Sequence, residues 1–517
     1  MLGRRNRQTT FDDVTWRQRI PKDSYWWRLH DWAVQNLDES MFAPLFDART
    51  GRPSVSPVHT FLALLIQMEK GYSDREMEQE SRFDDRVKLA ILAGRDFEGI
   101  DAVTLCDHRR RFLQHGIAAA MLERTLASAK QAGLFSPERS QIVDSFLIHG
   151  GAAVQDTYTL IRKGIVRVLA VARMHELDGP LSAVLKRTDY HQPGKPRIDW
   201  DDAEARRQLL QALVDDASAL VAAARALAKV PEDLKAMVDL LERVATQDIE
   251  RDPDGTVRLK QGVAKDRVIS VVDPEMRHGH KTASNRADGY KAHLMTGGEG
   301  HRLVTAVAVT PANAPDDARL EAMLDDQERH GHRPAEVLGD QAYFDVERAR
   351  RQAEKGTLIV AKAPPATNRE GYFSKEAFAL DADAGTLTCP AGQTVRFDPG
   401  RLQHHKGFVV SFAAEACGAC PLKARCTPAA ARQVTIHPYE VELRQARAYQ
   451  RTPAFRERYR LRARIERIVR QLKTHGARKA RYWGRIKVRF QLLLAAINHN
   501  IKEVMAAGPP VGVVGPA

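Results

Sequence analysis

One stretch without a helix breaker, residues 459–473, constrains this chain most. It contains neither Gly nor Pro, so it can run as one helix. In a helix, residues three, seven and fourteen positions apart from a given residue lie on the same face as that residue. Counted from Tyr459, these positions are Arg462, Glu466 and Lys473. Apolar residues repeat on an adjoining face and would anchor the helix to a core; they are Leu461, Ile465, Ile468, Val469 and Leu472. Glu466 is then either a salt-bridge partner for its cationic neighbours or a functional carboxylate.

Positive charge is concentrated around this stretch. Residues 441–490 contain 17 Lys or Arg and three Glu, a net charge of +14, whereas the whole chain carries +13. A localised excess of this kind indicates a polyanionic partner. An anionic membrane surface would also attract it, but the segment lacks the strongly apolar, aromatic-rich face that membrane binding needs. Nucleic acid is therefore the favoured partner.

Length and composition limit the remaining classes. A chain of 517 residues is too long for one core, and roughly two to four domains are expected. No run of 18 apolar residues occurs, so no membrane span is predicted. The N-terminus lacks the apolar stretch of a signal peptide. We therefore expect a cytoplasmic, nucleoid-associated protein.

Two acidic residues belong to predicted strands. Asp144 lies within the apolar run 141–148, which fits a buried strand, although an Asp that caps a short strand would look similar. Asp340 ends the predicted strand 335–340, and open α/β sheets place ligand-binding residues at such ends. Between them, residues 290–296 and 303–309 indicate a hairpin. A strand over 268–272, ending at Asp273, is also predicted.

Four of the five cysteines lie in residues 381–430, namely Cys389, Cys417, Cys420 and Cys426. Thiolates at C-x2-C spacing can meet one zinc ion, and a cytoplasmic location argues against disulfides. Against zinc, the cysteines do not form two clean C-x2-C pairs, so unliganded thiols remain an alternative. His404 or His405 could replace one thiolate, and the isolated Cys106 is interpreted as ordinary packing.

The flanking segments are helical or basic. Residues 1–135 read as helices, including 57–70, and fit either an oligomerisation bundle or a DNA-binding module. Residues 201–248 read as two packed helices inserted into the core. After the opening stretch, Arg478, Lys479 and Arg481 alternate with the aromatic Tyr482 and Trp483; such a pattern suits a nucleic-acid backbone, with rings available for stacking.

The spacing Tyr-x2-Arg-x3-Glu-x6-Lys resembles the signature of bacterial insertion-sequence transposases with a DDE triad on a ribonuclease-H-like core. Gly-Asp-Gln-Ala-Tyr around Asp340 resembles the second motif of that family, and Val-Asp-Ser around Asp144 resembles the first more loosely. Asp273 is the rival for the first position. The resemblance implies an α/β fold: a ribonuclease-H-like mixed sheet with helical and cysteine-rich insertions, preceded by an all-α domain.

The same resemblance implies the chemistry. Asp144, Asp340 and Glu466 would hold Mg²⁺, for which Mn²⁺ can substitute, and Tyr459, Arg462 and Lys473 would hold DNA phosphates. The expected protein is a homo-oligomer in its synaptic complex. It would bind the terminal inverted repeats of its own element, cleave there and join the ends to target DNA. A nuclease without strand transfer and a domesticated, non-catalytic DNA-binding protein are the alternatives.

The expected division of the chain follows from these features. It comprises a helical DNA-end-binding domain (1–135), a core with a helical insertion at about 200–250 (136–380), a cysteine-rich zinc-binding insertion (381–430), a basic C-terminal part of the core (431–507) and a disordered tail (508–517).

Overall fold

The structure is a computed structural model that describes residues 1–6, 10–47, 49–136, 139–280, 286–300, 302–366, 368, 370–403 and 407–507. The predicted tail 508–517 and the histidines at 404 and 405 lie outside these described residues. Within them, no helix is both long enough and apolar enough to cross a membrane.

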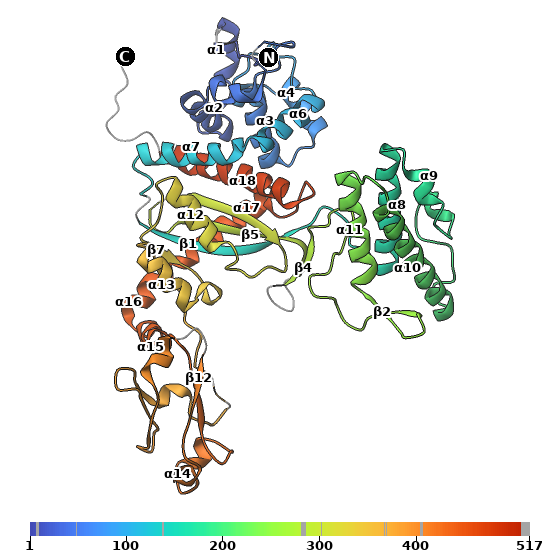
Figure 1. Ribbon diagram of the computed structural model, residues 1–517. Helices are drawn as coiled ribbons and strands as arrows, with labels where there is room; N and C mark the ends of the chain where they lie inside the picture. The colour runs from blue at the N-terminus through green and yellow to red at the C-terminus, as the bar shows by residue number, and fades with distance from the viewer. Residues whose placement is uncertain are drawn as a thin grey trace.

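A mixed sheet forms the centre of the molecule (Figure 1). Its strands run in the order β6-β5-β1-β7-β8, and the short β4 pairs with the start of β5. Strand β5 is antiparallel to β1 and β6, whereas β7 and β8 run parallel to β1. The α/β class and the predicted hairpin are confirmed. The strands are β1 (Ser140–His149), β4 (Arg277–His280), β5 (Arg286–Gly297), β6 (Val304–Pro311), β7 (Glu336–Leu338) and β8 (Leu358–Val360).

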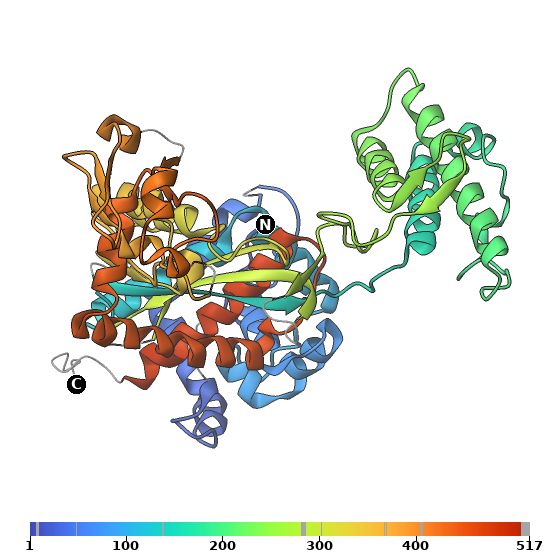
Figure 2. The same cartoon turned by 90° about the horizontal axis from the view of Figure 1, so that it is seen from below.

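Helices cover both faces of the sheet, because side chains alternate between the two faces along each strand. Ile142 and Phe146 of β1 pack in one core with α17 (Arg464–Leu472) and α18 (Arg485–Ala506). Val143 faces the opposite side, in a core with α12 (Leu320–Arg329) and Ala349 of α13 (Val346–Glu354). Figure 2 shows the sheet between these two helical layers.

The predicted strand over 268–272 is wrong. The residues are buried, but side-chain amides rather than a strand satisfy their backbone. Gln247 Nε2 donates to Val268 O at 2.9 Å, and Val268 N donates back to Gln247 Oε1 at 2.9 Å. Val271 N likewise donates to Gln155 Oε1 at 3.1 Å. Asp273 is therefore not at a strand end; it is buried and accepts a hydrogen bond from Tyr290 Oη at 2.6 Å.

The N-terminal part is helical, as predicted, from α1 (Phe11–Arg17) to α7 (Ile117–Gln131). Helix α3 (Pro57–Lys70) has the predicted Ser56 cap and ends at Gly71 in a left-handed conformation. The remaining helices are α2 (Tyr25–Asn36), α4 (Asp74–Phe83), α5 (Asp85–Ala90) and α6 (Ala102–Gln114), with the 3-10 helix η1 (Glu39–Leu45).

Helix α18 joins this helical part to the sheet (Figure 1). Asn498 Nδ2 donates to Leu65 O of α3 at 2.7 Å. Two residues later, Asn500 Nδ2 donates to Val304 O of β6 at 2.8 Å and to Thr125 Oγ1 of α7 at 3.0 Å. Val304 N donates to Asn500 Oδ1 at 2.7 Å. Buried amides therefore fix the N-terminal helices, α18 and the sheet to one another.

A helical lobe (residues 157–259) projects sideways from the sheet (Figures 1 and 2) and has its own apolar core. It begins before and ends after the segment of about 200–250 suggested by the sequence. Asp266 braces the lobe against the sheet, because it pairs with Arg243 of α11 and Arg277 of β4, each at 2.6 Å. Its elements are α8 (Thr157–Met174), α9 (Asp178–Ser182), η2 (Asp189–His191), α10 (Ala203–Arg225), α11 (Glu232–Thr246), β2 (Ile249–Arg251) and β3 (Val257–Leu259).

A second lobe, here called the cysteine lobe (residues 370–436), extends from the other end of the sheet (Figure 1). A small core that includes Phe378, Leu387 and Phe412 holds it together. Arg444 of α15 (Glu440–Tyr449) ties its base to the rest of the molecule by donating to Phe378 O at 2.7 Å. Its elements are η4 (Lys375–Ala377), β9 (Ala379–Asp381), β10 (Thr386–Thr388), β11 (Thr394–Arg396), η5 (Pro399–Gln403), β12 (Phe408–Ser411), α14 (Ala414–Gly418), η6 (Lys423–Arg425) and β13 (Gln433–Ile436).

The stretch 459–473 is helical throughout, but not as one regular helix. It comprises the end of α16 (Pro453–Arg460), a 3-10 turn, η7 (Leu461–Ala463), and α17, followed by the π turn η8 (Lys473–Ala477). The turn closes at Gly476, whose φ is +96°. A Cβ there would stand 2.3 Å from Met68 Sδ of α3, so only Gly suits this position.

Candidate active site

Asp144 lies on β1, and Asp340 lies two residues past the end of the neighbouring parallel strand β7. The pairing of β1 with β7 ends with Ile142 opposite Leu338. Asp144 and Asp340 each follow two residues later in their own segment. Side chains two positions apart point to the same face of a sheet. Asp144 and Asp340 therefore lie on the same face as Ile142 and Leu338, which is the face covered by α17. Burial raises the pKa of the Asp340 carboxyl, and the negative charge of Asp144 raises it further. The two carboxylates are therefore close enough to repel each other.

The Gly-Asp-Gln-Ala-Tyr segment shapes the backbone around Asp340. A Cβ on Gly339 would stand 2.8 Å from the Cβ of Tyr343, so the motif needs Gly there for the buried ring to pack. The Asp340 carboxylate accepts a hydrogen bond from Ala342 N at 2.9 Å and caps the 3-10 turn η3 (Gln341–Tyr343). The turn thus fixes the direction of the carboxylate.

Tyr459 and Arg462 reach the same place from the helical side. Burial raises the pKa of the Tyr459 hydroxyl, and the charges of Asp340 and Asp144 add to the effect. The positive charge of Arg462 opposes the rise for both Tyr459 and Asp340. The structure therefore brings two aspartates and two residues of the Tyr-Arg-Glu-Lys pattern into one electrostatic neighbourhood.

Glu466 stands at the edge of this neighbourhood. Its carboxylate lies 3.7 Å from Arg462 Nη1, and its side chain is 66% exposed. Lys473, two turns later, places Nζ 5.2 Å from the centre of the Phe146 ring on β1. Among the described residues, no three His, Cys, Asp or Glu side chains are close enough together, as they stand, to hold a metal ion. The predicted triad is thus not assembled as a ligand set.

Asp316 is a carboxylate that the sequence reasoning missed. Its Oδ1 accepts hydrogen bonds from Ser145 Oγ at 2.8 Å and from Lys291 Nζ at 2.7 Å. Its charge also raises the pKa of Asp340. The available signal was its position shortly after β6, which ends at the same edge of the sheet as β1.

The basic segment that follows α17 divides into exposed and buried parts. Arg478 and Lys479 are exposed, and their backbone pairs with the last residue of β1, since His149 N donates to Arg478 O at 3.1 Å. Arg481 differs from the prediction. Its Nη2 donates to Tyr72 O at 2.6 Å and its Nη1 to Gln67 O at 3.5 Å, which makes it a contact to the N-terminal helices.

The two aromatic side chains beside Arg481 also differ from each other. Burial raises the pKa of the Tyr482 hydroxyl, and the Arg109 guanidinium lies 5.3 Å from the centre of its ring. Tyr482 is therefore partly buried against Arg109 of the N-terminal helices. Trp483 is 53% exposed and keeps a free ring surface.

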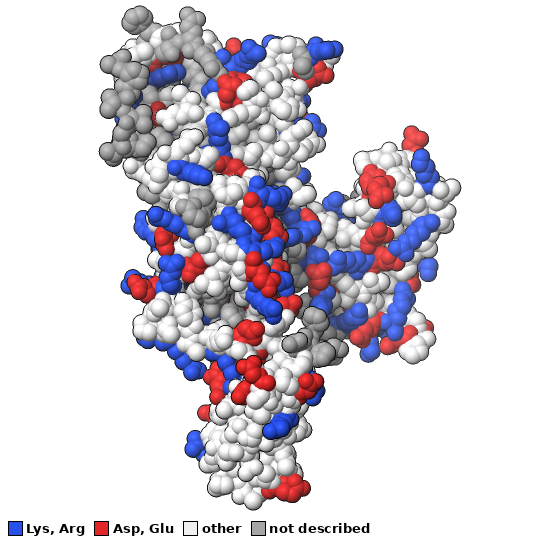
Figure 3. Space-filling view, turned by 60° about the vertical axis from the view of Figure 1, so that its left-hand side comes forward, with Lys and Arg blue, Asp and Glu red and all other residues white. Residues whose placement is uncertain are grey.

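Many of the Lys and Arg residues in 441–490, the segment with a net charge of +14, form contacts within the protein. At least eight of its 17 cations bond to other parts of the chain, namely Arg444, Arg447, Arg451, Arg458, Arg464, Arg481, Arg485 and Arg489. On the face in Figure 3, basic and acidic side chains are interleaved over the middle of the molecule. The exposed cations of the segment that remain include Arg460, Arg467, Arg470, Arg478, Lys479 and Lys487.

The four predicted cysteine ligands lie elsewhere, around one cavity in the cysteine lobe. All five cysteines are free thiols, and Cys106 is exposed on α6. The cysteines therefore form a site separate from the carboxylates.

Two family models match the chain. Residues 388–505 match a family described as "Transposase DDE domain", and residues 14–111 match "Transposase domain (DUF772)". Together, the two family models support a DDE-class transposase of an insertion sequence. The first match covers the cysteine lobe from Cys389 onward and the helices that carry Tyr459, Arg462, Glu466 and Lys473. Asp144 and Asp340 lie outside both matches. No curated protein and no solved structure matches the chain.

Proposed function

We propose that this transposase binds the terminal repeats of its own insertion sequence, cleaves the DNA there and joins the ends to target DNA. The observation that carries the proposal is the placement of Asp144 beside Asp340, on the face covered by the helix that bears Glu466. Arg462 lies close enough to Asp340 to lower the pKa of its carboxyl. A DNA phosphate at this position would meet both acidic metal ligands and a guanidinium group.

The sheet order supports a ribonuclease-H-like core. In β6-β5-β1-β7-β8, only β5 opposes the direction of β1. The proposed carboxylates occupy the first strand, the end of the fourth strand in sequence order of this core, and a later helix, as the resemblance implies. The helical lobe and the cysteine lobe are then insertions that leave this order unchanged.

The carboxylates fit Mg²⁺ in chemistry. Oxygen ligands suit this ion, and a divalent cation would relieve the repulsion that raises the pKa of Asp340. When bound, Mg²⁺ would polarise a phosphate and activate an attacking oxygen. We propose that Asp144 and Asp340 hold it and that Glu466 completes the site once DNA is bound, because Glu466 stands exposed beside Arg462.

The cationic residues of the chain would position the DNA. Arg462 and Lys473 would bind phosphates next to the cut, and Tyr459 would contact the same backbone. Arg467 and Arg470 share the exposed side of α17 with Glu466, so they would continue the contact outward. Because joining requires two ends in one complex, we propose a homo-oligomer as the active form.

The test uses a labelled duplex that carries the end sequence found beside the coding region, and a scrambled duplex as the control. We expect specific binding, Mg²⁺-dependent cleavage at the repeat boundary and joining to a target plasmid. Cleavage without joining would indicate a nuclease instead. Binding without cleavage in Mg²⁺ or Mn²⁺ would indicate a non-catalytic DNA-binding protein.

A further inference from the structure

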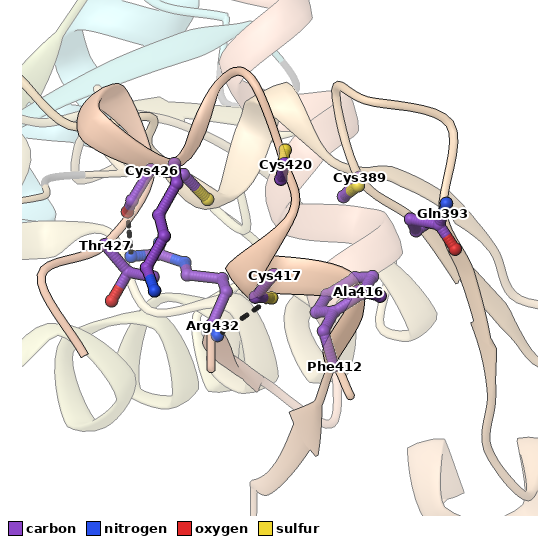
Figure 4. Close-up of a pocket in the computed structure, with 10 residues that line it drawn as sticks. Cys389, Gln393, Phe412, Ala416, Cys417, Cys420, Cys426, Thr427 and Arg432 are labelled. Carbon is purple, nitrogen blue, oxygen red and sulfur yellow. Dashed lines mark hydrogen bonds between the residues drawn. The ribbon is translucent and has the colours of Figure 1, made fainter. Parts of the chain in front are cut away.

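The cysteine lobe gathers residues from three separate places around one small cavity. Cys389, Cys417, Cys420 and Cys426 line a space of about 30 Å³, and Figure 4 shows their sulfur atoms around it. A volume of this size holds a single ion or water molecule and is too small for an organic ligand. The site lies in a lobe with its own apolar core, so the inference does not rest on the proposed function.

Cys417 and Cys420 come from one turn of chain. Cys417 is in α14, and Cys420 N approaches Cys417 O at 3.4 Å just after that helix ends. A short C-x2-C turn of this kind lets two thiolates reach one metal ion. Arg432 N also lies 3.5 Å from Cys417 Sγ and donates to it. A backbone N–H pointing at the sulfur would stabilise a thiolate there.

Cys389 reaches the cavity from a tight turn between β10 and β11. Cys389 N donates to Gln393 O at 2.8 Å, and Gly392 N donates to Cys389 O at 2.9 Å. Gly392 has a φ of +84°, a conformation that Gly adopts without strain. The turn reverses the direction of the chain between β10 and β11 and places Cys389 at the cavity. Cys389 reaches it although it is 28 positions before Cys417 in the sequence.

Cys426 completes the set. Cys426 follows the 3-10 turn η6, and its N donates to Lys423 O at 2.9 Å, so this turn brings it to the cavity that the other three cysteines line. Arg432 holds the backbone there by donating from Nη1 to Cys426 O at 3.2 Å. If the four thiols lost their protons, a divalent cation at their centre would compensate the negative charge.

We propose that Cys389, Cys417, Cys420 and Cys426 bind one structural Zn²⁺ ion. Among the described residues, no group of three or more possible ligands is arranged to hold a metal ion as it stands, so binding would have to draw the sulfurs to about 2.3 Å from the ion. Each thiol that ligates the ion would release its proton to solvent, and no electron is transferred. Four sulfur ligands select a soft or borderline ion rather than Mg²⁺.

The ion would stabilise the cysteine lobe in particular. The lobe's apolar core is small, and cross-linking three distant segments of chain would compensate for its size. Loss of the metal should therefore loosen residues 370–436 and leave the sheet, with Asp144 and Asp340, folded.

The experiment compares the full chain with Cys420→Ser, and with Cys106→Ser as the matched control. Protein purified without chelator should contain about one equivalent of zinc per chain. Cys106→Ser should keep this zinc, and Cys420→Ser should lose most of it. Zinc-free protein with four freely reactive thiols in the lobe, or a Cys420→Ser variant with unchanged zinc, would overturn the proposal.

A second measurement keeps the test decisive if Cys420→Ser fails to fold. The wild-type chain is treated with a chelator, and limited proteolysis is followed by mass spectrometry. New cleavage confined to residues 370–436, reversed when Zn²⁺ is added back, is the expected result. Identical cleavage patterns before and after chelation would contradict a structural ion in this lobe.

Discussion

The charge of Asp144 on β1 raises the pKa of Asp340, which lies just past the end of the adjacent parallel strand β7. A fold gains no stability from two carboxylates placed this way. Carboxyl groups whose pKa is raised by a neighbouring carboxylate are common at functional sites, where a bound cation removes the repulsion. Asp316 adds a third negative charge nearby, partly neutralised by its bond with Lys291.

Neutralising Asp340 should stabilise the metal-free protein. In Asp340→Asn the amide oxygen can still accept the hydrogen bond from Ala342 N, while the half-buried charge and its repulsion with Asp144 disappear. We expect the melting temperature in EDTA at neutral pH to rise by roughly 1–2 °C, the scale of a small single-site effect.

The pH dependence of this gain has a definite sign. Because the folded state raises the pKa of Asp340, ionisation of this group destabilises the fold at pH values above that pKa. The advantage of Asp340→Asn should therefore shrink as the pH falls and the wild-type carboxyl takes up a proton. An advantage that grows toward low pH would contradict this account of the pair.

Salt dependence should separate the two kinds of basic residue after α17. Replacing Arg478 and Lys479 by Ala should reduce the slope of log K against log[salt] for DNA binding by up to about two, at roughly 0.9 per phosphate contact. Arg481→Ala should leave that slope unchanged, because its guanidinium binds backbone carbonyls of the N-terminal helices. Equal slope changes for all three residues would show that Arg481 also meets DNA.

Trp483 should contribute to binding of unpaired bases. Its exposed ring lies close in sequence to Arg478 and Lys479, and stacking on a base is worth about 1–3 kcal/mol. Trp483→Ala should weaken binding to a duplex end with unpaired nucleotides and leave binding to a fully paired duplex nearly unchanged. Loss of affinity for both DNAs to the same extent would argue against stacking.

Asn500→Ala should destabilise the fold. The change leaves the N–H and C=O of Val304 without their partner inside a buried site, and one such group costs about 1–3 kcal/mol. Denaturant unfolding is the measurement. Lys487→Ala, at the exposed start of the same helix, is the control and should stay within about 0.5 kcal/mol of wild type.

The sequence predicted the parts of the fold that depend on local pattern. The cap at Ser56 with Pro57 behind it marked α3 correctly, and the acid after the short strand marked Asp340 at the end of β7. The hairpin of β5 and β6 was also readable, because β-branched runs flank a glycine-rich turn. In each case the signal and the element that it specifies lie within a few residues.

What the sequence left open depends on contacts between distant segments. Residues 268–272 have strand composition, but the side chains of Gln155 and Gln247 occupy their backbone. The sequence around Arg481 is typical of a DNA contact, but in the fold its guanidinium donates to the Gln67 carbonyl of α3. Asp316 became visible only through its bonds to Ser145 and Lys291. No local pattern encodes these partners.

The most direct test of the central claim compares Glu466→Gln with Glu457→Gln on one labelled terminal-repeat duplex in Mg²⁺. Both residues are exposed glutamates of the same basic segment, and both variants remove one negative charge. We predict that each variant binds the duplex at least as well as wild type. Cleavage should fall about 10²-fold or more for Glu466→Gln, as for Asp144→Asn and Asp340→Asn, and stay near wild type for Glu457→Gln. Near-normal cleavage by Glu466→Gln would contradict the assignment of the three carboxylates.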